Sequence, residues 1–382
     1  MSAPRSDAHI VEVVACAVLL AATAGCHVGP ASARSEAVAP APPACTATGS
    51  SPHAKLPLGE GTQRKLAAWR RTDAQWARWT DTSPHRVRMV AVSRDVRLEV
   101  LDWGGTGPAV VLLAGSGGTA HVYDDLAPQL TDELHVLAIT RRGHGVSSHA
   151  DSATYTIDSL TADIRAVLDT LGIGRVSLVG HSIAGAEITR FAVRYPDRVE
   201  KLVYLDAAHD FTGYNELIAA NPAWPLPVVL PAQGTHEDTL DAWRRWGKRC
   251  AFGYWSDALE IDAVRSPNAD SVELRLLTAD TQRQPKEYRK VRAPALALAA
   301  RYTADRWFFY LDPVRDSVKW RAAVRWIETG VLPFLAKGHQ RFLREIPHGR
   351  LVEFDSDHYV LIYRETRTLA ELRSFLGADR AR

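Results

Sequence analysis

Two side chains in this sequence have the types and the order that nucleophilic catalysis requires. Ser182 lies within the segment Gly-His-Ser-Ile-Ala, residues 180–184, and His358 follows it much later in the chain. A serine hydroxyl is a poor nucleophile until a base removes its proton, and an imidazole oriented by a carboxylate is a suitable base. The pair therefore predicts acyl transfer, with Ser182 as nucleophile and His358 as base.

The residues around Ser182 predict a tight corner between a strand and a helix. Four mostly apolar residues, 176–179, indicate a short buried strand, and Ile188, Phe191 and Tyr195 recur at helical spacing after it. Small residues flank the serine, which lets the backbone turn sharply and leaves the hydroxyl exposed at the carboxyl edge of a sheet. We call this corner, residues 180–185, the elbow.

A glycine-rich loop, residues 114–118, follows another predicted strand and has two interpretations. Its backbone N–H groups could bind the negative charge that develops on a substrate carbonyl oxygen. The alternative is a dinucleotide fingerprint, which would consist of Gly115, Gly117 and Ala120 with Arg141 and Arg142 after the next strand. Two predicted strands precede the loop and no tyrosine is followed by lysine four residues later, so the oxyanion loop is favoured. A phosphate-binding P-loop is excluded because no lysine follows the glycines.

Strands and helices alternate through the middle of the chain, which predicts an α/β fold with a mostly parallel sheet and helices on both faces. The predicted strands are residues 87–92, 96–103, 110–113, 134–140, 176–179, 202–205, 295–300 and 351–354. A clean apolar stripe predicts a helix over residues 157–171, and another pattern predicts a closing helix around residues 369–376. His358 lies between the last strand and this closing helix.

Two segments interrupt the alternation. Residues 207–292 contain clustered prolines and tryptophans with short helical pieces, which predicts a helical cap inserted into the sheet domain. A second, aromatic stretch up to about residue 347 is predicted to be irregular. No internal repeat is visible.

The N-terminal part is predicted to lie outside the fold. Residues 1–26 have the apolar run of an export signal, and residues 27–57 are rich in alanine, proline and serine, which predicts a disordered tether before a folded domain at 58–382. The signal resembles that of a bacterial lipoprotein, which implies a lipid on Cys26; cleavage after Ala33 is the alternative. Either predicts an exported protein, in the bacterial cell envelope or secreted.

Composition excludes several classes of function. The chain of 382 residues has a formal charge of +2, from 46 basic and 44 acidic residues, which gives no footprint for nucleic acid. The four cysteines do not have metal-finger spacing, and no HExxH or EF-hand pattern is present, so neither a metal nor a cofactor is predicted. Cys45 and Cys250 would remain after signal removal, and export would permit them to pair.

These motifs together resemble the α/β-hydrolase family over residues 86–378. The segments that carry the resemblance are residues 112–118, 141–147, 178–185, 195–199, 202–208 and 357–361. The branch most similar contains carboxylesterases and haloperoxidase-type perhydrolases. Epoxide hydrolases and haloalkane dehalogenases of the family use aspartate at the elbow, so Ser182 argues against both activities.

The resemblance implies a role for each site residue. Ser182 corresponds to the nucleophile and His358 to the base, while the backbone N–H groups of Ile183 and Ser116 correspond to the oxyanion donors. The acid of the triad usually follows the strand at residues 295–300, which favours Asp305. Some relatives place it after the preceding strand, where this chain has Asp206 as the alternative.

The sequence therefore predicts a serine hydrolase that cleaves an ester-type bond of a small or medium apolar substrate. A cofactor-free perhydrolase or amidase with the same triad, or a non-catalytic ligand-binding protein on the same fold, remains an alternative. The expected partner is a small molecule, with no nucleic acid, and a membrane would be reached only through the N-terminal lipid.

Overall fold

The computed structural model describes residues 82–220, 272–304, 317–356 and 358–377 of the chain. Several predictions fall outside these residues, namely the export signal with Cys26 and Ala33, the tether, Cys45, Cys250 and Asp305. None of the described helices combines the length and the apolar character that crossing a bilayer needs.

Eight strands form one sheet in the order β1-β2-β4-β3-β5-β6-β7-β8. Their bounds are β1 (Arg86–Ala91), β2 (Arg97–Gly104), β3 (Ala109–Leu113), β4 (His135–Ile139), β5 (Val176–His181), β6 (Val199–Leu205), β7 (Ala295–Ala300) and β8 (Gly349–Phe354). β2 runs antiparallel to both of its neighbours, and the pairs from β4 to β8 are all parallel. The predicted α/β class and the mostly parallel sheet are confirmed.

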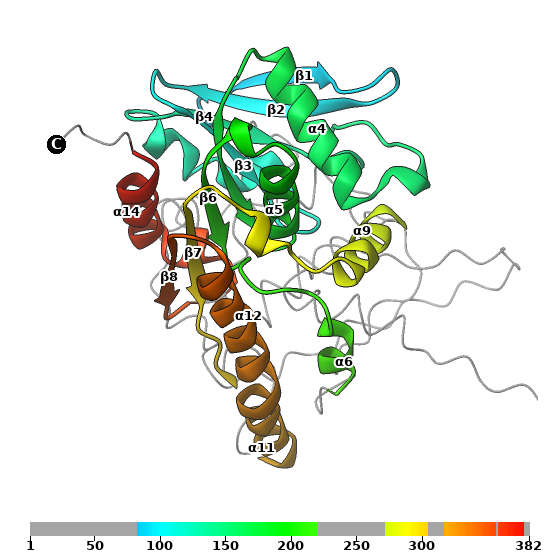
Figure 1. Ribbon diagram of the computed structural model, residues 1–382, viewed down its shortest axis with the longest axis vertical. Coiled ribbons are helices and arrows are strands. Elements are labelled where there is room, and N and C mark those ends of the chain that lie inside the picture. The colour runs from blue at the N-terminus through cyan, green and yellow to red at the C-terminus, as the bar shows by residue number, and fades with distance from the viewer. Residues whose placement is uncertain (1–81, 221–271, 305–316, 357, 378–382) are drawn as a thin grey trace, which may run out of the picture.

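The sheet has a hydrophobic core on each face, which explains why its central strands are apolar throughout. In β3, Val110 and Leu112 belong to one core, whereas Val111 and Leu113 belong to the other. Helices α4 (Ile157–Thr170) and α5 (Ala184–Arg194) cover one face, and α14 (Glu365–Leu376) covers the opposite face (Figure 1). A strand buried on both faces has no polar side, so the pattern of alternating polarity is lost.

The stretch predicted to be irregular between β7 and β8 contains helices instead. Helix α11 (Ser317–Trp326) continues through one wider π-helical turn (Ile327–Val331) into α12 (Leu332–Glu345). Although Pro333 lies in the first turn of α12, α11 and the π-helical turn run directly into it, so the proline stands inside a continuous helix. Its ring and its missing N–H would conflict with a regular helix there, and the wider turn relieves that conflict. The prediction was wrong because the proline hides a helical pattern in which Trp326 and Phe342 are buried.

The described parts of the segment between β6 and β7 include two helices that pack on different neighbours. Helix α9 (Val272–Arg283) lies against α4, since Asp280 Oδ2 accepts a hydrogen bond from the Ile157 N–H at 2.9 Å. Helix α6 (Tyr214–Ala219) lies beside the α11–α12 rod, and Trp326 Nε1 donates to the Leu217 carbonyl at 3.1 Å (Figure 1).

Candidate active site

The carboxyl ends of five neighbouring strands bring the candidate catalytic residues to one edge of the sheet. Ser182 directly follows β5, Asp206 directly follows β6, and Tyr302 and His358 follow β7 and β8. The glycine-rich loop follows β3, which is the neighbour of β5 on its other side. In a parallel sheet these ends form the crevice where ligands bind.

The elbow is held by close backbone contacts that only small residues permit. Ser182 has a positive φ of 54°, a conformation that non-glycine residues rarely adopt. A Cβ added at Gly180 would lie 2.9 Å from the Ala184 carbonyl carbon, and one at Gly185 would lie 2.5 Å from the Ala207 oxygen. The strand, the turn and helix α5 therefore meet without room for a further methyl group, and the strained serine is fixed at their junction.

The glycine-rich loop passes directly against the elbow. A Cβ added at Gly115 would lie 2.6 Å from His181 Nδ1 and 3.3 Å from Ser182 Cβ. Within the described residues, neither the Ser116 N–H nor the Ile183 N–H donates a backbone hydrogen bond. The two predicted oxyanion donors thus lie on the two segments that meet at Ser182, and no described backbone carbonyl accepts a hydrogen bond from either N–H.

His358 is paired with a buried carboxylate. Its Nδ1 lies 2.6 Å from Asp206 Oδ2, and His358 and Asp206 are both buried. Asp206 also accepts a hydrogen bond from the Ala300 N–H at 2.9 Å and one from the Tyr302 hydroxyl. Asp206 has a positive φ of 47°, so a second site residue occupies an unusual backbone conformation. The imidazole is oriented with Nε2 as its remaining proton acceptor.

Asp206 stays ionised in spite of its burial. Burial by itself raises the pKa of this carboxyl, but the hydrogen bond and charge of His358, together with His209 and the Tyr302 hydroxyl, outweigh it and lower the pKa to about 2. Burial lowers the pKa of His209 to about 3 and that of His181 well below its usual range, so both are neutral. An ionised carboxylate against His358 can stabilise the imidazolium that forms when this ring takes a proton.

The sequence favours Asp305 as the acid and keeps Asp206 as the alternative; of the two, Asp206 is the one that the structure describes, and it lies beside His358 Nδ1. Asp305 lies outside the described residues. On the β7 side it is Tyr302 that contacts Asp206, and its hydroxyl also lies 3.2 Å from His358 Nδ1. Sequence reasoning missed Tyr302, because a lone tyrosine after a strand carries no motif.

Arg141 and Arg142, which the dinucleotide alternative requires for a ribose phosphate, are both used inside the protein. Arg142 forms a bidentate ion pair with Asp163, at 2.7 and 2.6 Å. Arg141 Nε donates to Glu187 at 2.6 Å, and its other nitrogens donate to carbonyls of the glycine-rich loop. These contacts argue against a dinucleotide site at this loop.

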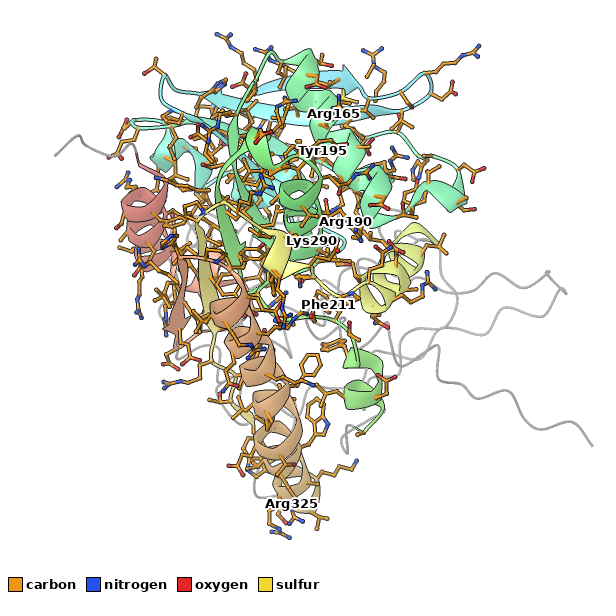
Figure 2. All side chains as sticks on the ribbon, viewed as in Figure 1. Arg165, Arg190, Tyr195, Phe211, Lys290 and Arg325 are labelled. Atoms are coloured by element: carbon orange, nitrogen blue, oxygen red, sulfur yellow. The ribbon has the colours of Figure 1, made fainter. Side chains whose placement is uncertain are left out.

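A cleft with about 550 Å³ of open space lies in front of Ser182, and Ser116 and His358 also line it. The rest of its wall is largely apolar and aromatic, including Phe211, Tyr214, Leu217, Val331, Phe334 and Leu335. Figure 2 shows Phe211 between the end of the sheet and helix α6. His209 also lines this cleft, as a neutral polar group that sequence reasoning missed.

Among the described residues, one cluster has the groups to hold a metal ion. His85, His121 and Asp124 place their ligand atoms within 4.8 Å of one another. The Asp124 carboxylate already lies 3.1 Å from His121 Nδ1 and 3.4 Å from His85 Nε2, and His121 Nε2 lies 3.4 Å from Glu99. These contacts account for the cluster as a buried network of imidazoles and carboxylates, and none of its members lines the cleft.

Comparison with known proteins agrees with this architecture. Residues 108–242 match the family model described as the alpha/beta hydrolase fold. Over 172 residues the chain is 32% identical to a fluoroacetate dehalogenase from Burkholderia sp, covering 41% of this chain and 57% of that protein. It is also 32% identical over 139 residues to the sn-1-specific diacylglycerol lipase ABHD11 of Mus musculus, covering 36% of this chain and 45% of the lipase. These matches therefore span about half of each relative's length.

Solved structures extend the similarity over most of the chain. The structure of an E-2-(acetamidomethylene)succinate hydrolase superposes with a TM-score of 0.55 at 25% sequence identity, covering 76% of this chain and 99% of that one. The matched family model, the sheet topology and this superposition agree on one assignment. The chain has the α/β-hydrolase fold.

Proposed function

We propose that this protein is a serine hydrolase that cleaves an ester bond through an acyl-enzyme intermediate. The observation that carries the proposal is the pairing of His358 Nδ1 with Asp206 at 2.6 Å, at the edge of the same cleft that the strained Ser182 lines. The match to the hydrolase family model supports hydrolysis in general, and the identity of the elbow residue as serine supports a covalent acyl intermediate.

The proposed reaction has two steps. His358 Nε2 takes the hydroxyl proton of Ser182 while the oxygen attacks the ester carbonyl carbon, and the Ser116 and Ile183 N–H groups bind the oxyanion. The bond to the leaving alcohol then breaks, and protonated His358 donates its proton to the alcohol oxygen. In the second step His358 takes a proton from water, the hydroxide attacks the acyl carbon, and Ser182 recovers its proton as the acid leaves.

The wall of the cleft supports an apolar substrate of small or medium size. Aromatic and aliphatic side chains from α6 and α12 face the space in front of Ser182. A cleft of this kind binds mainly by removing apolar surface from water, with a few polar groups that fix the orientation of the ligand. We therefore expect esters with aliphatic or aromatic acyl groups to react faster than esters with charged ones.

A serine-reactive fluorophosphonate tests the proposal directly. We expect one adduct per chain, located by mass spectrometry on the peptide that contains Ser182, and loss of p-nitrophenyl ester hydrolysis in parallel. Ser182→Ala should abolish both, whereas the exposed Ser152→Ala should change neither. Unchanged esterase activity in Ser182→Ala would overturn the proposal. Parallel assays with matched amides, and with peroxide and halide, would identify an amidase or a perhydrolase.

A further inference from the structure

One buried guanidinium contacts both segments that carry the oxyanion donors. Arg141 follows β4, and its side chain lies beneath the glycine-rich loop, where only 4% of its surface is exposed. Nη1 donates to the Gly115 carbonyl at 2.8 Å, and Nη2 donates to the Ala114 carbonyl. Nε donates to Glu187 of α5 at 2.6 Å.

The contact with the Gly115 carbonyl bears on the direction of an oxyanion donor. The Gly115 C=O and the Ser116 N–H belong to one planar trans peptide, so the two bonds point in opposite directions. A carbonyl held by Arg141 on the buried side therefore turns the Ser116 N–H toward the other side of the loop, and Ser116 lines the cleft there. A charged donor on the carbonyl also polarises the peptide, which strengthens the N–H as a donor.

The contact with Glu187 connects the second donor to the same group. Glu187 lies four residues after Ile183, one helical turn along α5, and is fully buried. Because a helix is stiff over one turn, a guanidinium that binds Glu187 on one side and the loop on the other controls the separation between the Ser116 and Ile183 N–H groups. The planar fork of arginine can make these bonds at once, whereas a single ammonium cannot.

From this geometry we propose that Arg141, with Glu187, is a positioning residue that sets the oxyanion hole for the transition state. The inference rests on the proposed serine hydrolase function and adds to it a residue pair outside the triad. A buried ion pair is by itself weak evidence for stability, because desolvation offsets much of the attraction. A role in orienting donors explains why a charged pair lies beneath the loop.

The neighbouring pair, Arg142 and Asp163, provides a matched control. It is also a buried arginine–carboxylate pair, one residue further along the chain, and among the described residues its guanidinium bonds Asp163 and not the glycine-rich loop. We compare Arg141→Met/Glu187→Gln with Arg142→Met/Asp163→Asn, because replacing both members avoids an unpaired buried charge.

The test measures kcat and KM for a p-nitrophenyl ester and the inhibition constant of an aryl trifluoromethyl ketone, which forms an oxyanion when Ser182 adds to it. We expect Arg141→Met/Glu187→Gln to lower kcat by about 100-fold and to raise the inhibition constant of the ketone by a similar factor. KM should change by less than about threefold. The Arg142 control should lose thermal stability, but its kcat and its inhibition constant for the ketone should stay within about threefold of the wild-type values.

Arg141→Lys gives a second measurement, in a variant that keeps a positive charge at position 141 opposite Glu187. A lysine can reach one carbonyl or Glu187 but cannot hold both, so we expect an intermediate loss of kcat, about tenfold. Wild-type kcat and ketone inhibition in both Arg141 variants would overturn the inference, as would equal losses in the Arg142 control. If activity still depends on Ser182 in those experiments, the proposed function stands without this inference; if it does not, the proposed function itself fails.

Discussion

The two halves of the candidate site are held in position by different kinds of contact. The nucleophile half, which consists of the elbow and the glycine-rich loop, depends on backbone conformation and on the absence of side chains at positions such as Gly115 and Gly185. The acid–base half depends on side-chain hydrogen bonds, because His358, Asp206 and Tyr302 come from three strands and meet only through their polar atoms.

This difference determines how each half responds to change. A backbone arrangement fixed by close packing tolerates almost no added volume, and a single methyl group shifts it. A hydrogen-bonded arrangement tolerates changes of similar shape but not the loss of a donor, an acceptor or a charge. We therefore expect steric substitutions to inactivate the nucleophile half and isosteric polar substitutions to inactivate the acid–base half.

Asp206→Asn should have the largest effect. The amide keeps the shape of the carboxyl but cannot stabilise the imidazolium, so we expect kcat to fall on the order of 10⁴-fold. Steady-state kinetics with a p-nitrophenyl ester measure it. Asp305→Asn is the comparison, and we expect it to cost less than about tenfold. A larger loss in Asp305→Asn than in Asp206→Asn would identify Asp305, the candidate after β7, as the acid.

Gly115→Ala tests the nucleophile half by steric means. The added Cβ would lie 2.6 Å from His181 Nδ1, which forces the loop away from the elbow. We expect kcat to fall by about 100-fold and the free energy of unfolding to drop by about 1–3 kcal/mol. Gly174→Ala is the control, because a Cβ there meets nothing within 4 Å. Similar kinetics in the two variants would show that close packing at Gly115 does not position the nucleophile half.

Tyr302→Phe tests the acid–base half without changing its volume. Loss of the hydroxyl removes one donor from Asp206, so the pKa of this carboxyl should rise from about 2, and kcat should fall about five- to tenfold. Tyr204→Phe is the control, since it removes a buried hydroxyl that bonds Thr189 instead. We expect it to affect stability alone. Equal kcat values in both variants would show that Tyr302 does not support the acid.

Lys286→Met probes a charge buried beside the acid–base half, and its effect on kcat should be the smallest of the four. Lys286 Nζ donates to the His209 carbonyl, and burial lowers the pKa of this lysine to about 7. Between that pH and about 10.4 the unfolded chain binds a proton that the folded chain lacks, so stability should rise with pH, by at most ~1.4 kcal/mol per pH unit.

Chemical denaturation of wild type and Lys286→Met across this pH range measures that slope. The methionine variant should lack the rise between about pH 7 and 10.4, whereas wild type and Lys290→Met, an exposed lysine on the same segment, should keep it. An identical slope in all three proteins would mean that Lys286 keeps its ordinary pKa.

The nucleophile half could be predicted from the sequence because its determinants are local. The apolar strand, the small residues around Ser182 and the following helical spacing are contiguous, so one segment of residues specifies the corner. The central strands could be located for the same reason, since each of them is a short run of apolar residues. His358 could be found because its position after the last strand follows from the order of elements.

The acid–base half could not be assigned as fully, because its contacts join residues far apart in the chain. Asp206 and Asp305 each follow a strand in the sequence, and their choice depends on which carboxyl the folded sheet brings to His358 Nδ1. The contact between Tyr302 and Asp206 and the contact between Arg141 and Glu187 also join separate elements. A motif records neighbours along the chain and contains no information on these packing partners.

The π-helical turn between α11 and α12 makes the cleft wall sensitive to chain length. Such a turn holds one residue more than a regular turn, and each helical residue rotates the chain by about 100°. Deleting one residue from this turn would keep Phe334 and Leu335 at the cleft but rotate Trp326 away from its contact with α6. Homologous chains could therefore diverge in the shape of this wall through single-residue insertions and deletions, with every catalytic residue retained.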